Sequence, residues 1–134
     1  MGAADSLDAL LARVKFGADG LVPAVAQQHD TGEVLMLAWM SAESLRATLS
    51  SRRVTYWSRS RKSLWRKGDT SGHEQHLVDL RLDCDGDAIL LLVDQAGPAC
   101  HLERRSCFFT ALRDGAAVDV PDAEAVPTGA RGRT

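Results

Sequence analysis

The run from Glu33 to Met40 constrains the fold of this chain more than any other segment. After Glu33, its residues Val34-Leu35-Met36-Leu37-Ala38-Trp39-Met40 are all apolar. A strand without a polar face must be covered on both sides, so this run predicts a central strand of a sheet. A second strand-like run, Val22 to His29, precedes it, and the connection Asp30-Thr31-Gly32 is typical of a β-hairpin.

Two segments have the features of short amphipathic helices. Residues 6–16 place leucines at helical spacing behind Ser6, a suitable N-cap. Ser41 is expected to cap a second helix that extends to about Ser50. Further strands are expected over four runs rich in β-branched, aromatic or alternating apolar residues: 54–58, 75–83, 88–94 and 107–112. In the run 75–83, Val78, Leu80 and Leu82 are expected to face the core. The predicted fold class is α+β and mainly β.

Length and composition predict one domain. The chain has 134 residues, of which 45% are hydrophobic, enough for a core of ordinary size. We expect the domain to cover residues 1–114 and residues 115–134, which are poor in large apolar groups, to form a flexible tail. The net charge of −2 argues against nucleic-acid and anionic-membrane partners. Without an apparent signal or membrane-spanning run, the protein is expected in the cytoplasm.

The three cysteines and a nearby acidic run indicate metal chemistry. Cys84, Cys100 and Cys107 are the cysteines of the chain, and Cys84 lies within Asp83-Cys84-Asp85-Gly86-Asp87. Thiolates favour a soft ion such as zinc, whereas clustered carboxylates favour a hard ion such as magnesium. Three thiolates leave one position of a tetrahedral zinc site for water, as hydrolysis requires. Two simpler interpretations remain: a closed structural site completed by His101, and a solvated turn at the aspartates.

The order of residues around Cys84 suggests how two metals could share one segment. If residues 83–87 are extended, the three aspartates point to one face and Cys84 to the other. Cys84 could then meet Cys100 and Cys107 of a partner chain rather than those of its own. Gly86 could bend the strand and defeat this alternation.

A basic stretch follows the strand expected at 54–58. Its guanidinium, ammonium and hydroxyl groups suit a phosphate monoester, and an indole could stack on a nucleobase. The candidate substrate-binding residues are Arg59, Arg61, Trp65, Lys67 and Ser71. The same composition is typical of a solvated loop or a nucleic-acid patch. His101, beside Cys100, and His73 are the candidates for catalytic proton transfer.

Several ordered motifs of the chain match one family. They are Gly32 to Met40, Ser58-Arg59-Ser60-Arg61, Leu64-Trp65 with Lys67-Gly68, Ser71-Gly72, Asp83 to Asp87, Gln95 to His101 and Ser106-Cys107-Phe108. Through these motifs, roughly residues 20–110, the chain resembles phosphoribosyl-AMP cyclohydrolase of histidine biosynthesis. It departs from the pattern at Asp69, where the family usually has glutamate, and at Leu102-Glu103, where it has threonine-glycine.

The resemblance implies a fold, a reaction and two metals. The fold is a small mixed β-sheet domain with two short helices in an intertwined homodimer. The reaction is hydrolytic opening of the adenine ring of phosphoribosyl-AMP between N1 and C6, giving a formimino carboxamide ribotide. Zinc is bound by Cys84 of one subunit with Cys100 and Cys107 of the other, and magnesium by Asp83, Asp85 and Asp87. His101 is the expected proton shuttle.

Two other functions agree with part of the sequence. Another zinc-dependent purine-nucleotide deaminase or amidohydrolase would use the same metal, but its usual cysteine spacing is missing after Pro98. A zinc-stabilised nucleic-acid-binding module would use the basic residues 59–67.

Overall fold

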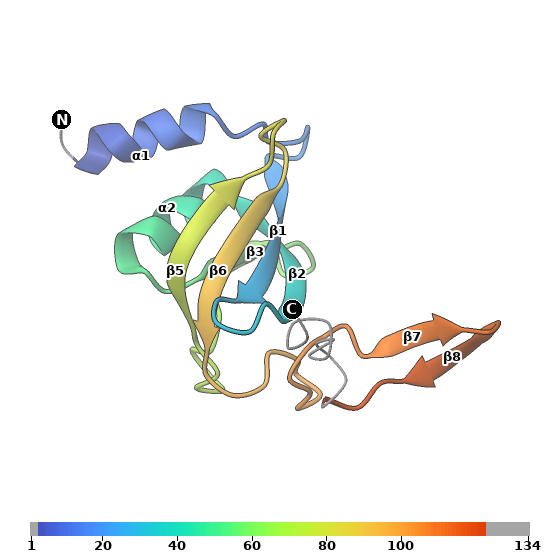
Figure 1. Cartoon of the computed structure of the whole chain (residues 1–134). Coiled ribbons are helices and arrows are strands. Elements are labelled where there is room, and N and C mark those ends of the chain that lie inside the picture. Colours follow the sequence, from blue (N-terminus) through green and yellow to red (C-terminus); the bar gives the residue numbers. More distant parts are fainter. Residues whose placement is uncertain (1–2, 123–134) are drawn as a thin grey trace.

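The computed structural model describes residues 3–122 and contains a curled sheet, two helices and a projecting hairpin (Figure 1). The helices are α1 (Ala3–Ala12) and α2 (Ala42–Ser51). The six strands of the main sheet are β1 (Leu21–Gln28), β2 (Val34–Ser41), β3 (Thr55–Ser58), β4 (Ser63–Arg66), β5 (Gln75–Leu82) and β6 (Ile89–Gln95). The hairpin consists of β7 (Thr110–Arg113) and β8 (Ala116–Asp119).

The main sheet has the strand order β4-β3-β2-β1-β6-β5. Strands β1 and β6 pair in parallel at its centre, and the other neighbours are antiparallel. The sheet curls until β5 meets the segment before β3: Arg53 pairs with His76, and the Val54 amide donates to the Gln75 carbonyl over 3.0 Å. The two ends of the sheet therefore lie close together.

The concave side of the curled sheet is filled by apolar side chains and covered by α2. Leu35, Tyr56, Leu91 and Val93 are fully buried, as is Leu45 from α2. The helix begins with a reciprocal capping box, in which Ser41 and Ser44 each bond the other's amide. The predicted cap at Ser41 is confirmed.

A chain of buried side-chain hydrogen bonds crosses this core. The Tyr56 hydroxyl donates to Gln75 Oε1 over 2.6 Å, and Gln75 Nε2 donates to Gln95 Oε1 over 2.8 Å. Burial raises the pKa of Tyr56 well above its usual range, so the hydroxyl stays a donor. The chain continues to Gln28, whose Oε1 accepts from the Gln95 amide over 2.9 Å. Strands β1, β3, β5 and β6 are thereby joined inside the sheet.

The structure confirms the mainly β fold class, the hairpin 22–40 and the central position of β2. The apolar side chains of β2 are not all covered, because Val34 and Leu37 are 41% and 48% exposed. Val78 is also exposed instead of core-facing, because a bulge between Leu77 and Asp79 shifts the register of β5. The first helix begins at Ala3, so Ser6 lies within it and is not its N-cap.

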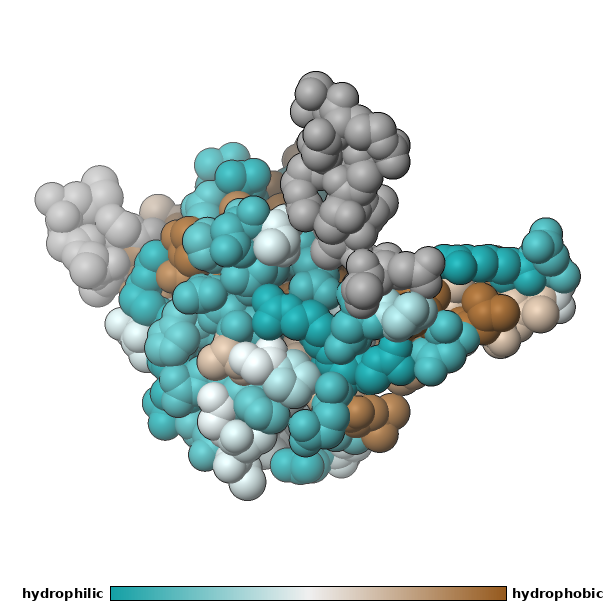
Figure 2. Space-filling view, turned by 60° about the horizontal axis from the view of Figure 1, so that its bottom comes forward, coloured by the Kyte–Doolittle hydropathy of each residue, from teal (hydrophilic) through white to brown (hydrophobic). Residues whose placement is uncertain are grey.

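The largest differences concern strands formed by polar or exposed residues. Strand β4 lies within the basic stretch expected to be a loop and pairs with β3. The strand expected at 107–112 starts at Thr110, and its partner β8 lies in the segment expected to be a tail. Residues 123–134 of that expected tail lie outside the described residues. Figure 2 shows apolar surface along part of the projecting hairpin, where Leu112 is 85% exposed.

No helix among residues 3–122 is long and apolar enough to cross a membrane.

Replacing Tyr56 with phenylalanine tests the buried hydrogen-bond chain. The substitution leaves Gln75 Oε1 without its donor inside the core, so we expect the free energy of unfolding to fall by about 1–3 kcal/mol. Ser60→Ala, which removes a hydroxyl from an exposed turn, should change it by less than about 0.5 kcal/mol. Denaturant unfolding measures both values, and equal stability of the two variants would contradict the account.

Candidate active site

Two of the three cysteines lie together in the loop that follows β6. Cys100 is buried and Cys107 is exposed, and the two thiols are close enough for Cys100 to affect the pKa of Cys107. Loss of hydration by the thiol raises the pKa of Cys107 to about 11, and Cys100 adds to this rise while Lys67 opposes it. Adjacent thiols are a donor set that zinc prefers, so this pair fits half of a tetrahedral zinc site.

Main-chain hydrogen bonds fix the loop that carries the pair. The amides of Ala99 and Cys100 each donate over 3.1 Å, to the carbonyls of Arg105 and Arg104. At the end of this segment, residues 96–107, which we call the cysteine loop, the Cys107 amide donates to the Leu35 carbonyl of β2 over 2.7 Å. The loop is therefore closed on itself and attached to the central sheet.

Lys67 is a buried ammonium group beside the two thiols. Its residue is only 8% exposed, and its Nζ donates to the Ala99 carbonyl over 2.6 Å. Burial lowers the pKa of Lys67, while Cys107 and Cys100 raise it. The ammonium also lies 5.5 Å from the centre of the Trp65 ring. The structure thus brings Lys67 and Trp65 to the cysteine pair.

The two candidate histidines differ in their surroundings. His101 is exposed in the loop directly after Cys100. His73 is half-buried and packs against Gly97, where an added Cβ would lie 2.8 Å from the His73 Cδ2 atom. Both histidines therefore neighbour the loop that carries Cys100.

The three aspartates lie together in the turn between β5 and β6. Their ligand atoms lie within 4.8 Å of one another, and all three residues are exposed. A hydrogen bond with Asp83 and repulsion by its charge raise the pKa of Asp87. A divalent cation would relieve this repulsion, so the carboxylate group suits a hard ion such as magnesium.

Residues 83–87 are not extended, and the alternative in which Gly86 bends the chain is the one found. The Gly86 amide bonds the Asp83 carbonyl and Gly86 has a φ of 76°, so the segment is a turn. The aspartates meet because the chain folds back, with the Asp87 amide donating to Asp83 Oδ1 over 3.0 Å. Strict alternation of side chains therefore does not explain the separation of Cys84 from the carboxylates.

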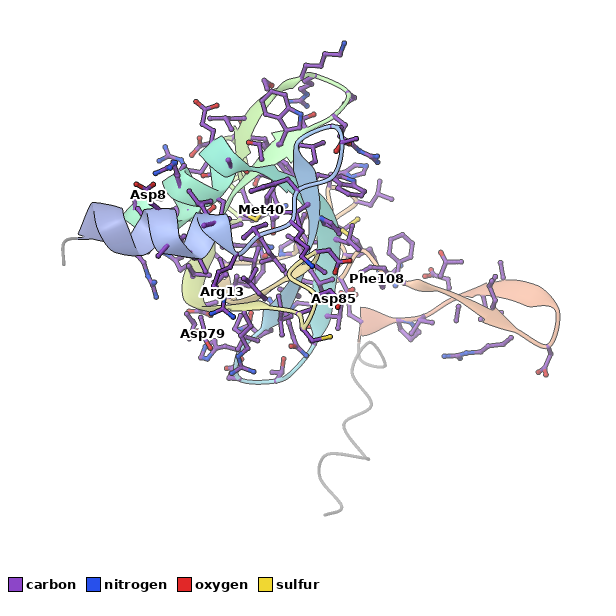
Figure 3. The ribbon with its side chains drawn as sticks, turned by 90° about the horizontal axis from the view of Figure 1, so that it is seen from above. Asp8, Arg13, Met40, Asp79, Asp85 and Phe108 are labelled. Carbon is purple, nitrogen blue, oxygen red and sulfur yellow. The ribbon has the colours of Figure 1, made fainter. Side chains whose placement is uncertain are left out.

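A hollow of about 690 Å³ lies between this turn and the end of α1. Arg13, Lys15, Cys84 and Asp85 line it, and Figure 3 labels Arg13 and Asp85. The Lys15 amide donates to the Gly86 carbonyl over 2.8 Å, which attaches the segment after α1 to the turn. The basic residues of this hollow were not among the predicted site residues.

Cys84 does not join the cysteine pair within one chain. Among residues 3–122, the aspartate triad is the one group of three or more histidine, cysteine or acidic residues whose ligand atoms all lie within 4.8 Å of one another. The three cysteines do not form such a group. Cys84 is exposed beside that triad, so its thiol is accessible to another molecule.

The other predicted substrate-binding residues lie on exposed turns. Arg59 stacks on the Trp39 ring at 4.5 Å, and the Arg61 amide donates to Ser58 Oγ. Ser71 Oγ accepts from the His73 amide over 3.1 Å, so Ser71 supports the turn that carries His73.

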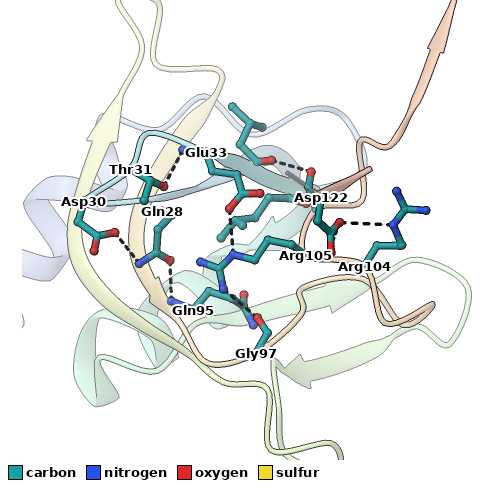
Figure 4. A network of polar contacts seen from close by, with 12 residues as sticks. Gln28, Asp30, Thr31, Glu33, Gln95, Gly97, Arg104, Arg105 and Asp122 are labelled. Atoms are coloured by element: carbon teal, nitrogen blue, oxygen red, sulfur yellow. Dashed lines mark hydrogen bonds and ion pairs between the residues drawn. The ribbon is translucent and has the colours of Figure 1, made fainter. Parts of the chain in front are cut away.

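Sequence reasoning missed a half-buried ion pair beside the cysteine loop. Arg105 Nε donates to Glu33 Oε1 over 2.9 Å, and Glu33 is 6% exposed (Figure 4). The two residues are far apart in the chain, and each looks like an ordinary surface charge in the sequence. The position of Glu33 directly before an apolar strand was the one feature of the sequence that pointed to a buried charge.

The chain is similar to proteins of one known family. A model of the phosphoribosyl-AMP cyclohydrolase family matches residues 36–109. A protein of that name from Rhodospirillum centenum is 68% identical over 118 residues, covering 88% of this chain and 89% of that protein. One from Paramagnetospirillum magneticum is 61% identical over 127 residues, covering 95% and 96%. The chain therefore belongs to the phosphoribosyl-AMP cyclohydrolase family.

Proposed function

We propose that this protein opens the adenine ring of phosphoribosyl-AMP by hydrolysis between N1 and C6, with zinc at the cysteines and magnesium at the aspartates. Family membership supports the enzyme class, a hydrolase of histidine biosynthesis. The observation that supports the metal assignment is the pair Cys100 and Cys107, which main-chain bonds hold at the two ends of one short segment and whose thiols are close enough for Cys100 to raise the pKa of Cys107.

The third zinc ligand in this proposal is Cys84 of a second copy of the chain. Within one chain Cys84 lies at the aspartate turn, apart from the other two cysteines, and its residue is exposed. A symmetric dimer would give each cysteine pair one Cys84 from the opposite subunit and so form two equal sites. The homodimer is thus required for a complete donor set.

Zinc held by three thiolates would supply a water of lowered pKa at its fourth position. The ribosyl group on N1 gives the adenine ring a positive charge, which makes C6 electrophilic. His101, which is exposed and follows Cys100, would be the general base that accepts a proton from the attacking water. His73, packed against Gly97, is the second group that could return a proton to the departing nitrogen.

Two groups of charged residues, on the β3–β4 turn and on the aspartate turn, suit the two phosphate monoesters of the substrate. Arg59 and Arg61 are exposed and carry forked donors for phosphate oxygens. Asp83, Asp85 and Asp87 would hold magnesium at the turn, where it could bind a phosphate. Lys67 is buried and faces the cysteines, so its contribution lies at that pair.

The proposed activity is tested by adding phosphoribosyl-AMP to zinc-loaded protein with magnesium and following the ultraviolet spectrum. We expect the adenine absorption to change as the ring opens. Cys100→Ala should lose both bound zinc and turnover, because one of three thiolates is removed. An unchanged spectrum with the zinc-loaded protein refutes the activity, and normal turnover of Cys100→Ala refutes the role of zinc.

Asp85→Asn tests the magnesium assignment. Asp85 suits this purpose because Asp83 Oδ1 also accepts an amide within the turn. We expect the magnesium concentration for half-maximal activity to rise about tenfold or more, with unchanged zinc content, because the cation loses a charged ligand. Asp79→Asn, an exposed change in β5, is the control. The same magnesium dependence in both variants would argue against the assignment.

Gly97→Ala tests the position of His73. Gly97 has a φ of 70°, and an added Cβ would lie 2.8 Å from the His73 ring. We expect kcat to fall at least about tenfold because the imidazole is displaced. Gly20→Ala is a matched control, since Gly20 has a φ of 78° with nothing within 4 Å of an added Cβ. Steady-state kinetics decides, and equal kcat values would show that the His73 position is unimportant.

A further inference from the structure

Glu33 is a buried carboxylate outside the set of proposed ligands and catalytic residues. It precedes β2 and is 6% exposed. Its Oε1 atom accepts from Arg105 Nε over 2.9 Å. A buried charge without a partner is strongly unfavourable, so the ion pair holds Arg105 at this place next to the sheet.

Arg105 connects both ends of the cysteine loop. Its Nη1 donates to the Gly97 carbonyl over 3.1 Å, at the start of the loop, and its own carbonyl accepts from the Ala99 amide over 3.1 Å. Figure 4 shows the guanidinium between Glu33 and Gly97. One side chain therefore ties the turn before Cys100 to the segment that leads to Cys107.

The same region is attached to β2 immediately after Glu33. Ser106 Oγ donates to the Val34 carbonyl over 2.7 Å, and the Cys107 amide donates to the Leu35 carbonyl. Residues 105, 106 and 107 of the cysteine loop are thus bonded in order to residues 33, 34 and 35, at the start of β2. The position of Cys107 is thereby set from the central strand.

We propose that Glu33 and Arg105 are positioning residues that set the separation of the Cys100 and Cys107 thiols for metal binding. Arg105 donates to the Gly97 carbonyl, which lies three residues before Cys100, and Arg105 itself lies two residues before Cys107. A displaced Arg105 side chain would therefore move the two thiols relative to each other. The guanidinium is suited to this role because its planar fork reaches two acceptors in fixed directions. This inference rests on the zinc site proposed above.

Two substitutions separate positioning from simple stabilisation. Arg105→Lys keeps the positive charge but cannot donate to Glu33 and Gly97 in the same fixed directions. Glu33→Gln keeps the shape of the side chain and removes its charge. If Glu33→Gln does not yield folded protein, Arg105→Lys decides alone. Arg46→Lys, in the exposed pair of Arg46 with Asp8, is the matched control.

The readouts are zinc affinity, by competition with a chelator, and the absorption spectrum of the protein saturated with Co²⁺. We expect zinc affinity about 10- to 100-fold lower in both variants, as is typical when groups that orient metal ligands are changed. The thiolate-to-cobalt absorption should also change at saturation, because the thiols are displaced. The control should match the unaltered protein in both measurements.

Two results would overturn the inference, and they are distinguishable. If the unaltered protein gives no thiolate-to-cobalt absorption, the proposed zinc site fails and the inference fails with it. If the unaltered protein gives this absorption and both variants match it in spectrum and affinity, the site stands and the ion pair only stabilises the fold. A lower melting temperature alone, with unchanged metal properties, counts as this second result.

Discussion

The parallel pairing of β1 with β6 is the constraint on which the rest of the structure depends. Because the two strands run in the same direction, their carboxyl ends, Gln28 and Gln95, lie at the same end of the sheet. The buried bond from the Gln95 amide to Gln28 Oε1 ties these ends together. The β1–β2 turn follows β1 and the cysteine loop follows β6, so these two segments meet at this end of the sheet. The ion pair between Glu33 and Arg105 lies at their meeting point.

The site is consequently built from loops attached to a rigid frame. Within the cysteine loop, main-chain bonds close residues 99–105 on themselves, and residues 106–107 attach the loop to β2. Lys67, from the turn after β4, adds a charged contact to the Ala99 carbonyl. Three segments distant in sequence thus hold one pair of thiols. The aspartate turn is positioned by two strands alone, because it connects the antiparallel neighbours β5 and β6 directly.

Features set by neighbouring residues could be predicted from the sequence. The capped start of α2 at Ser41 and the central position of β2 were predicted from local spacing and composition, and both are confirmed. The register of β5 could not be predicted, since a bulge after Leu77 turns Val78 outward. Strand β4 was missed because pairing with β3 outweighs its polar composition. The contact of Glu33 with Arg105 depends on tertiary structure alone, and periodicity carries no signal for it. The cysteines and aspartates could be proposed as ligands from the sequence because their side chains suggest metals whatever the fold.

The most direct test of a zinc site shared between two chains is to mix Cys84→Ala protein with Cys100→Ala protein. Each variant alone lacks one ligand in every site and should be inactive. In a mixed dimer, the intact pair of the first chain meets the intact Cys84 of the second, so one of the two sites is complete. If subunits exchange at random, activity on phosphoribosyl-AMP should recover to about a quarter of the unaltered value, with zinc binding restored in proportion. The shared site would be contradicted if the mixture stays inactive and free of zinc although subunit exchange has been demonstrated.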